Sequence, residues 1–151
     1  MSFKDQSFDR RFSAMGDEAE GKFERIFPDN YVRFGLNRPP LHMASLPERL
    51  RHMPDYLTSK GFIECKGIGR DDTVKLKVME FSCMNFWHQI HPMRIFVWSS
   101  YRFAWTMLAF EQIRSLIDDG SATLDRYHDG KAYFGLVGDN FTWTELDRVD
   151  N

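Results

Sequence analysis

The stretch His52–Gly67, with the sequence HMPDYLTSKGFIECKG, decides the predicted fold of this chain. Residues 52–58 and 62–67 are rich in apolar and β-forming side chains, and Ser59-Lys60-Gly61 between them is short enough for a tight turn. We therefore predict two antiparallel strands joined as a hairpin, and the remaining elements are arranged around it.

The register of this hairpin brings two carboxylates together. If Ser59 and Lys60 form the loop, Asp55 faces Glu64 directly, and their Cβ atoms are roughly 5 Å apart. Two acids at that distance repel each other unless one is protonated or a cation lies between them. A three-residue loop would move the register by one position and would still leave the two acids as near neighbours.

Lys66 completes the group, because alternate residues of a strand share one face. Glu64 and Lys66 point to one side, and Ile63 and Cys65 point into the core. Hard oxygen ligands favour Mg²⁺ or Mn²⁺, which polarises a phosphodiester and activates water, while the lysine orients that water or stabilises the transition state. Gly67 would let a nucleic-acid backbone approach closely. The alternative is an ordinary hairpin with its polar residues in solvent.

This stretch resembles the PD-(D/E)xK nuclease superfamily. Pro54-Asp55 and Glu64-Cys65-Lys66 match its motif, and PDY, a turn and FIECKG are most similar to phage junction-resolving endonucleases. The resemblance covers residues 18–99 in element order and 53–67 in motif detail. It implies an α/β fold with a restriction-endonuclease-like αβββαβ core and a mixed central sheet flanked by helices. It also implies metal-dependent DNA cleavage in recombination or DNA processing, as in Holliday-junction resolution.

The resemblance further implies an acid from the first core helix. Glu20 is the candidate, because at about 100° per residue it lies beside the apolar stripe of a helix predicted for residues 17–27. Glu24 and Glu18 are weaker candidates. The alternative for Glu20 is an acid that simply favours a helix N-terminus.

Basic residues after the second strand are the candidate nucleic-acid contacts. Lysines early in the helix that follows the E-x-K strand often bind phosphate in such enzymes, and Lys75 and Lys77 occupy that region, with Arg70 just before it. On a helix, two residues that are two positions apart face different sides, so at most one of the two lysines is expected in the site.

The other elements are predicted from hydrophobic periodicity and from breaker residues. Helices are expected over 47–51, from 71 or 72 to 88, and over 103–117. Strands are expected over 31–36 and 93–99, and a C-terminal hairpin over 122–127 and 132–137. The last dozen residues are polar and predict a tail. The helix ending at residue 88 is apolar on more than one side, which favours a homodimer or another protein contact.

Length and composition set the outer limits. The 151 residues suit one domain, 1–151, and 42% hydrophobic residues indicate a globular protein. The net charge is −2, although residues 33–77 hold nine basic and five acidic residues, which is compatible either with a phosphate-facing surface or with random scatter. There is no apolar run of membrane-spanning length and no signal sequence, so we expect a protein in the cytoplasm of a bacterial or phage-infected cell.

Two function classes follow. The first is a Mg²⁺- or Mn²⁺-dependent DNA endonuclease in which Asp55, Glu64 and Glu20 bind the metal and Lys66 assists the attacking water. The second is a nuclease fold without catalysis that acts as a DNA- or protein-binding assembly module. An enzyme acting on RNA or on DNA ends is a variant of the first class. Two lone cysteines without a CxxC pair disfavour zinc.

Overall fold

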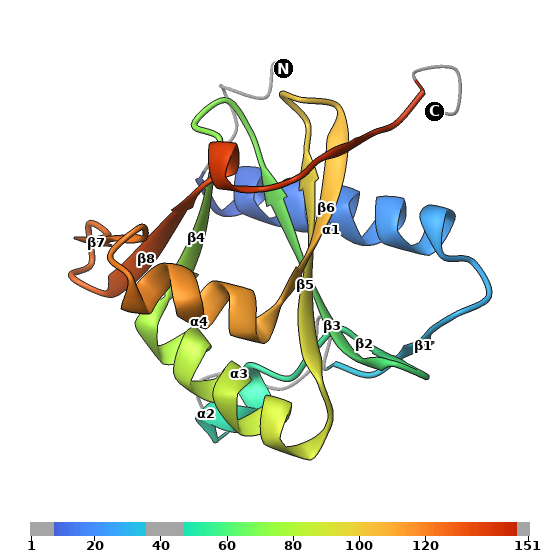
Figure 1. Cartoon of the computed structure of the whole chain (residues 1–151), viewed down its shortest axis with the longest axis horizontal. Helices are drawn as coiled ribbons and strands as arrows, with labels where there is room; N and C mark the ends of the chain where they lie inside the picture. The colour runs from blue at the N-terminus through green and yellow to red at the C-terminus, as the bar shows by residue number, and fades with distance from the viewer. Residues whose placement is uncertain (1–7, 36–46, 148–151) are drawn as a thin grey trace.

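A computed structural model describes residues 8–35 and 47–147 of the chain (Figure 1). Its elements follow in the order α1 (Phe8–Ile26), β1 (Val32–Arg33), α2 (Glu48–Arg51), β2 (Tyr56–Thr58), β3 (Gly61–Ile68), β4 (Thr73–Lys77), α3 (Val78–Ile90), β5 (Met93–Ser99), β6 (Ala104–Ala109), α4 (Phe110–Asp118), β7 (Thr123–Arg126), β8 (Ala132–Val137), the 3₁₀ helix η3 (Gly138–Asn140) and β9 (Thr144–Glu145).

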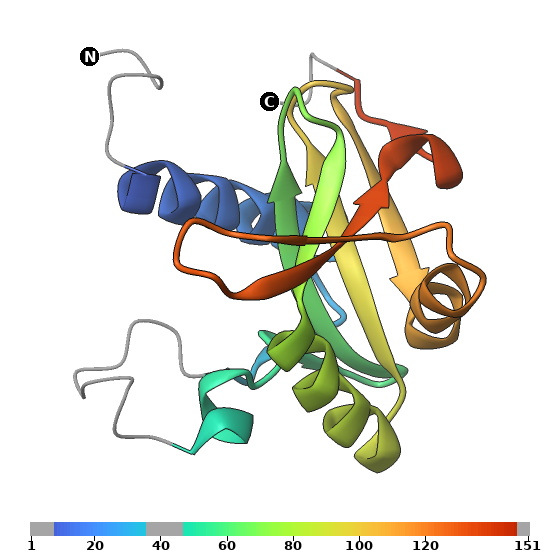
Figure 2. The same ribbon diagram turned by 90° about the vertical axis from the view of Figure 1, so that its left-hand side faces the viewer.

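Two sheets organise these elements. The central sheet is mixed, in the order β1-β2-β3-β5-β6-β9, and β3 and β5 form its parallel pair, from Phe62 opposite Met93 to Ile68 opposite Ser99. A smaller antiparallel sheet has the order β4-β8-β7. Helix α1 crosses one face of the central sheet, and α3, α4 and the small sheet lie on the other side (Figures 1 and 2). The prediction of a mixed sheet flanked by helices is therefore confirmed.

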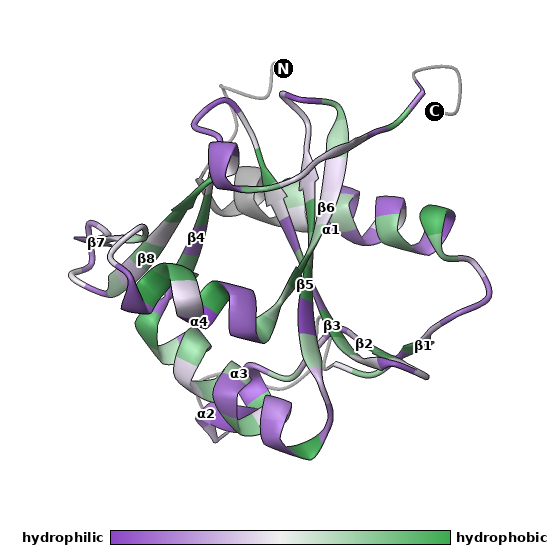
Figure 3. Cartoon of the chain, viewed as in Figure 1, coloured by the Kyte–Doolittle hydropathy of each residue, from purple (hydrophilic) through white to green (hydrophobic). Residues whose placement is uncertain are grey.

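Each face of the central sheet has its own apolar core. Phe23 of α1 packs against Ile63, Cys65 and Phe96 of β3 and β5 on one face. On the other face a larger cluster joins β3, β5 and β6 to α3, α4 and the small sheet. Hydrophilic residues occur in the loop at β7 and in stretches of α1 and α4 (Figure 3). Cys65 and the second cysteine, Cys83, are both buried free thiols.

The hairpin register is confirmed, but its first strand is shorter than predicted. Thr58 faces Gly61 and Tyr56 faces Ile63, so Ser59 and Lys60 are the two loop residues. Residues 52–55 are outside the strand. The predicted strand 31–36 is observed only as β1, and position 36 is outside the described residues. Helix α1 begins at Phe8, earlier than predicted, so Asp17 lies within the helix and does not cap it.

Two predicted helices each prove to be a strand followed directly by a helix. The region predicted as a helix up to residue 88 begins with β4, whose Val74 and Leu76 are buried while Lys75 is exposed. The region 103–117 begins with β6, in which buried and half-buried residues alternate. In both regions the apolar residues repeat every two positions in the strand and every 3.6 positions in the helix, and no Gly or Pro separates the two. Taken together, the two patterns give apolar residues on several sides of a single predicted helix. Leaving out α2 and β4, the order α1-β1-β2-β3-α3-β5 is the expected αβββαβ.

The C-terminal hairpin is confirmed as β7 and β8. The predicted tail is wrong for residues 140–147, because Thr144 and Glu145 of β9 pair with Trp105 and Ala104 of β6. Residues 148–151 lie outside the described part. Among the helices described, none combines the length and apolar character needed to cross a bilayer.

Candidate active site

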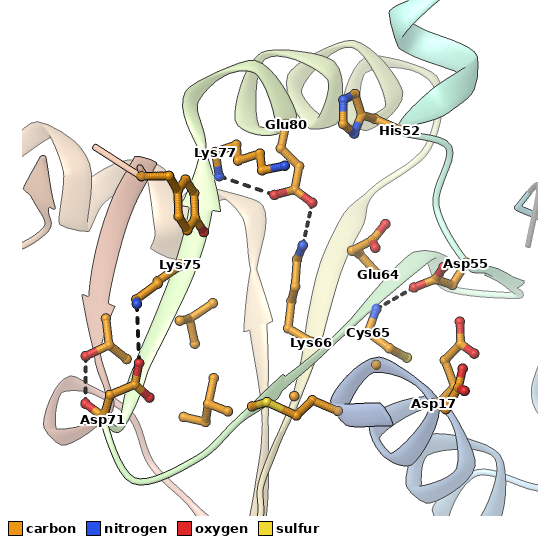
Figure 4. Close-up of a pocket in the computed structure, with 18 residues that line it drawn as sticks. Asp17, His52, Asp55, Glu64, Cys65, Lys66, Asp71, Lys75, Lys77 and Glu80 are labelled. Carbon is orange, nitrogen blue, oxygen red and sulfur yellow. Dashed lines mark hydrogen bonds and ion pairs between the residues drawn. The ribbon is translucent and has the colours of Figure 1, made fainter. Parts of the chain in front are cut away.

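A cavity of about 550 Å³ opens beside β3, where β2 has ended. The last β2–β3 pair is Tyr56 with Ile63, so the part of β3 from Glu64 onward lies beyond the end of β2. Helix α1 lines one side of the cavity and β4 with the start of α3 lines the other (Figure 4). Six acidic side chains line it: Asp17, Glu20, Asp55, Glu64, Asp71 and Glu80. Three lysines stand against them: Lys66, Lys75 and Lys77.

Asp55 and Glu64 both lie in this cavity. Asp55 lies just before β2, and its side chain is bound to the backbone of β3. Its Oδ2 accepts a hydrogen bond of 2.9 Å from the backbone N–H of Cys65. Burial raises the pKa of Asp55. Burial, and after it the negative charge of Asp55, raises the pKa of Glu64 well above its ordinary value. The doubly ionised pair is therefore unfavourable without a compensating cation.

Lys66 lies on the same strand face as Glu64 and forms an ion pair with Glu80 (Figure 4). Burial alone would lower the pKa of Lys66, but the negative charges of Glu80 and Glu64 outweigh it and raise the pKa above its ordinary value. Burial would likewise raise the pKa of Glu80, and Lys66 reverses that shift. Lys66 is therefore an ammonium at neutral pH, and it can donate hydrogen bonds but cannot act as a base.

Glu80 is one of the cavity residues that the sequence analysis missed. It lies in the first turn of α3, where its Oε1 also accepts a 3.2 Å hydrogen bond from the backbone N–H of Lys77. This is the contact of an acidic capping residue at a helix start. The misplaced helix boundary hid it, because a helix from residue 72 puts Glu80 in mid-helix. Recognising the alternation of β4 would have placed Glu80 at the start of α3.

The acids of α1 separate into two groups. Glu20, the predicted metal ligand, lines the cavity, and so does Asp17, which the sequence analysis did not single out. Glu24 instead accepts hydrogen bonds from the hydroxyl groups of Tyr31 (2.9 Å) and Tyr56 (3.0 Å). Glu18 accepts one from the indole N–H of Trp98, so the two weaker candidates are used in packing α1.

His52 reaches the cavity from the loop between α2 and β2 (Figure 4). Burial lowers the pKa of His52, although the charge of Glu80 opposes this shift. The imidazole is therefore neutral at neutral pH and can accept a proton.

Gly67 lines the cavity, but the absence of a side chain there has another explanation, which is the close contact of β3 with α1. A Cβ at this position would collide with the backbone carbonyl oxygen of Met15. Gly67 therefore lets α1 cross β3 closely, and this close crossing accounts for the glycine without any approach by nucleic acid.

Lys75 and Lys77 correct the expectation that at most one of them lies in the site. Both belong to β4, where residues two apart share a face, and both line the cavity. Arg70 lies in the loop between β3 and β4 as an exposed side chain, outside the residues that line the cavity.

The donors fit a hard divalent cation. Asp55 and Glu64 offer carboxylate oxygens, and the acids lining the cavity outnumber its lysines by six to three. Mg²⁺ is typically bound through one or two carboxylates and keeps several waters, so it does not need a full protein cage. Within residues 8–35 and 47–147, no three His, Cys, Asp or Glu side chains are already arranged around a common metal position. A metal would thus be held by the two carboxylates of Asp55 and Glu64, with water molecules as its other ligands.

Comparisons with known proteins found a structural likeness. No protein-family model matches the chain, and no curated protein matches it. Among solved structures, the chain is similar to Hjc of Archaeoglobus fulgidus, a Holliday junction resolvase from an archaeal hyperthermophile. The identity is 12%, the TM-score is 0.48, and the likeness covers 89% of this chain and 94% of that chain.

Proposed function

We propose that this protein is a divalent-metal-dependent nuclease that hydrolyses phosphodiester bonds of DNA. One observation carries the proposal: Asp55 and Glu64 are held together at the open edge of β3, with the pKa of each raised by burial and that of Glu64 raised further by Asp55. A folded protein gains nothing from such a pair unless a cation or a proton resolves the repulsion. The PD…ExK motif on the same residues points to the cation.

Asp55 and Glu64 would hold the metal, with Glu20 completing the set from α1. When bound, Mg²⁺ or Mn²⁺ would polarise the phosphodiester and lower the pKa of a water molecule. The cation would also offset the excess of acids over lysines in the cavity, which would otherwise repel a phosphate chain.

Lys66 serves as a fixed positive donor. Its raised pKa keeps it charged, and Glu80 holds the ammonium in the cavity. From there it orients the attacking water or donates to a phosphate oxygen as negative charge develops there. His52, neutral and lining the same cavity, is positioned to take up a proton.

A cleavage assay tests the proposal. The protein is incubated with supercoiled plasmid and with a four-way junction in Mg²⁺. Asp55→Asn keeps an oxygen that can accept from Cys65 N–H but removes the charge, and Lys66→Ala removes the ammonium. We expect each variant to lose at least about a hundredfold in cleavage rate. Circular dichroism establishes that each variant is folded.

Asp118→Asn and Lys60→Ala are the matched controls, because both side chains are exposed and neither lines the cavity. They should cut like the parent. If Asp55→Asn and Lys66→Ala also cut like the parent, the site assignment is wrong. Calorimetric titration with Mn²⁺ separates an enzyme from a pure assembly module, because only a metal site at Asp55 gives heat that Asp55→Asn abolishes.

A further inference from the structure

The small sheet β4-β8-β7 turns one face to the core and the other to the active-site cavity. Val74 and Leu76 of β4 are buried with Leu136 of β8 in the core. Lys75 and Lys77 alternate with these buried residues and therefore point the other way, into the cavity. The two lysines thus lie on the wall opposite α1, where Lys75 also forms a 3.7 Å ion pair with Asp71 (Figure 4).

Two tyrosines lie on the same face of the small sheet. Tyr133 of β8 stands opposite Lys77 in the sheet register, and Tyr127 follows β7 and lines the cavity. Their ring centroids are 4.4 Å apart. The Nζ of Lys77 is 5.9 Å from the ring centroid of Tyr127, and that of Lys75 is 5.5 Å from the centroid of Tyr133. Both distances are within the range of cation–π attraction. We call this surface the tyrosine–lysine face; it consists of Lys75, Lys77, Tyr127 and Tyr133.

We propose that the tyrosine–lysine face binds an unpaired nucleotide of the DNA substrate beside the phosphate to be cut. This inference rests on the proposed nuclease function and specifies its substrate. The lysines would attract the phosphate chain, whereas the carboxylate wall repels it wherever no cation is bound. The Tyr127 ring offers an apolar surface on which a base can stack, and every base has a face that fits it.

The face suits an unpaired nucleotide better than a duplex. In a duplex both faces of each base are covered by its neighbours, so a protein ring can stack only on a base that has left the helix. Tyr127 lies inside a concave cavity together with Glu64 and Lys66. A base stacked there would therefore be close to the proposed cleavage position. The substrate class is DNA with single-stranded or unstacked nucleotides, such as a branch point, a flap or a strand end.

Binding without cleavage tests this inference. The parent for the experiment is Asp55→Asn in EDTA, so no metal is present and no strand is cut. Fluorescence anisotropy measures the affinity for a labelled single-stranded DNA and for a duplex of the same length. Tyr127→Ala should bind the single strand about tenfold more weakly and the duplex equally well. Tyr127→Phe, which keeps the ring, should restore the affinity. Tyr101→Ala is the control, because Tyr101 is 63% exposed and does not line the cavity.

A second pair of variants tests the lysines. Lys75→Ala with Lys77→Ala should lower the salt dependence of binding by about two phosphate contacts, whereas Lys60→Ala should leave it unchanged. Unchanged single-strand affinity in Tyr127→Ala, or an equal loss on single strand and duplex, overturns the inference. Either result is independent of catalysis, because the assay needs no cleavage. A chain that binds as expected but never cuts would refute the nuclease proposal and leave this face as a nucleotide-binding surface.

Discussion

Glu64 should make the metal-free protein less stable as pH rises. Its pKa in the folded state is raised well above the ordinary 4.5 by burial and by Asp55. Between those two pKa values the folded state holds more protons than the unfolded state, so the stability that Glu64 contributes falls as pH increases. Mg²⁺ should restore stability above this window, because it binds the ionised carboxylates of the folded state only.

Thermal unfolding in EDTA and in Mg²⁺ across pH 4.5 to 8 measures this effect. Glu64→Gln should unfold at a higher temperature than the parent in EDTA at neutral pH and should lose the Mg²⁺-dependent increase. Glu145→Gln, an exposed acid on β9, is the control and should follow the parent. Identical pH profiles for Glu64→Gln and the parent in EDTA would show that Glu64 carries no unfavourable charge.

Single residues could be predicted where local geometry determines them. Asp55 and Glu64 flank a short hairpin, so counting along it was enough to place them near each other, although Asp55 lies just outside the strand pairing. Glu80 could not be found in this way. Its partner Lys66 lies 14 positions earlier in the chain, and their contact depends on where α3 begins and how it packs on β3.

The crossing of α1 over β3 depends on the space at Gly67. Gly67→Ala should push the helix away from the strand, because the added methyl group meets the Met15 carbonyl oxygen. We expect a loss of about 1–3 kcal/mol in the free energy of unfolding, measured by urea denaturation. Cleavage should also fall, because α1 carries Glu20 into the cavity.

Gly69→Ala is the matched control for this variant. A Cβ at Gly69 would lie 3.9 Å from the Met15 side chain, an ordinary contact. If the two variants have the same stability, the close crossing does not constrain the helix.

Elements were predicted well where a breaker or turn separates them. The β2–β3 hairpin, β5 and the β7–β8 hairpin all have such boundaries. β4 and β6 were missed because Lys77 and Ala109 switch the chain from strand to helix with no Gly or Pro between. Predicting β4 as a helix also affected the predicted site. Residues two apart face different sides of a helix but share one face of a strand, so Lys75 and Lys77 were not expected together.

Arg102 fastens the two sheets together at one end. It follows β5 of the central sheet, and its Nε donates a 2.8 Å hydrogen bond to Asp72 just before β4. It donates another of 2.7 Å to Asp139 just after β8. The guanidinium also lies 5.1 Å from the ring centroid of Trp143. Arg102 therefore links the central sheet to the segments that adjoin β4 and β8 of the small sheet.

Arg102→Lys should weaken this contact, because an ammonium cannot reproduce the planar fork of donors. We expect a decrease of about 1.5–3 kcal/mol in unfolding free energy, seen as a lower urea midpoint. Arg114→Lys is the control, since Arg114 is exposed and its Nη2 donates a 2.7 Å hydrogen bond to Asn85 at the surface. Equal midpoints for Arg102→Lys and the parent would mean that the sheets are held by their apolar core alone.

The pairing of β4 with β8 gives the C-terminal quarter of the chain a part in the site. A chain shortened after Gly120 would keep all six acidic residues of the cavity, yet β4 would lose its strand partner in the small sheet. Val74 and Leu76 would then be uncovered beside an open strand edge, which is the kind of surface through which chains aggregate. The C-terminal hairpin contributes no carboxylate to the cavity, yet by covering the edge of β4 it keeps the protein that carries the site soluble.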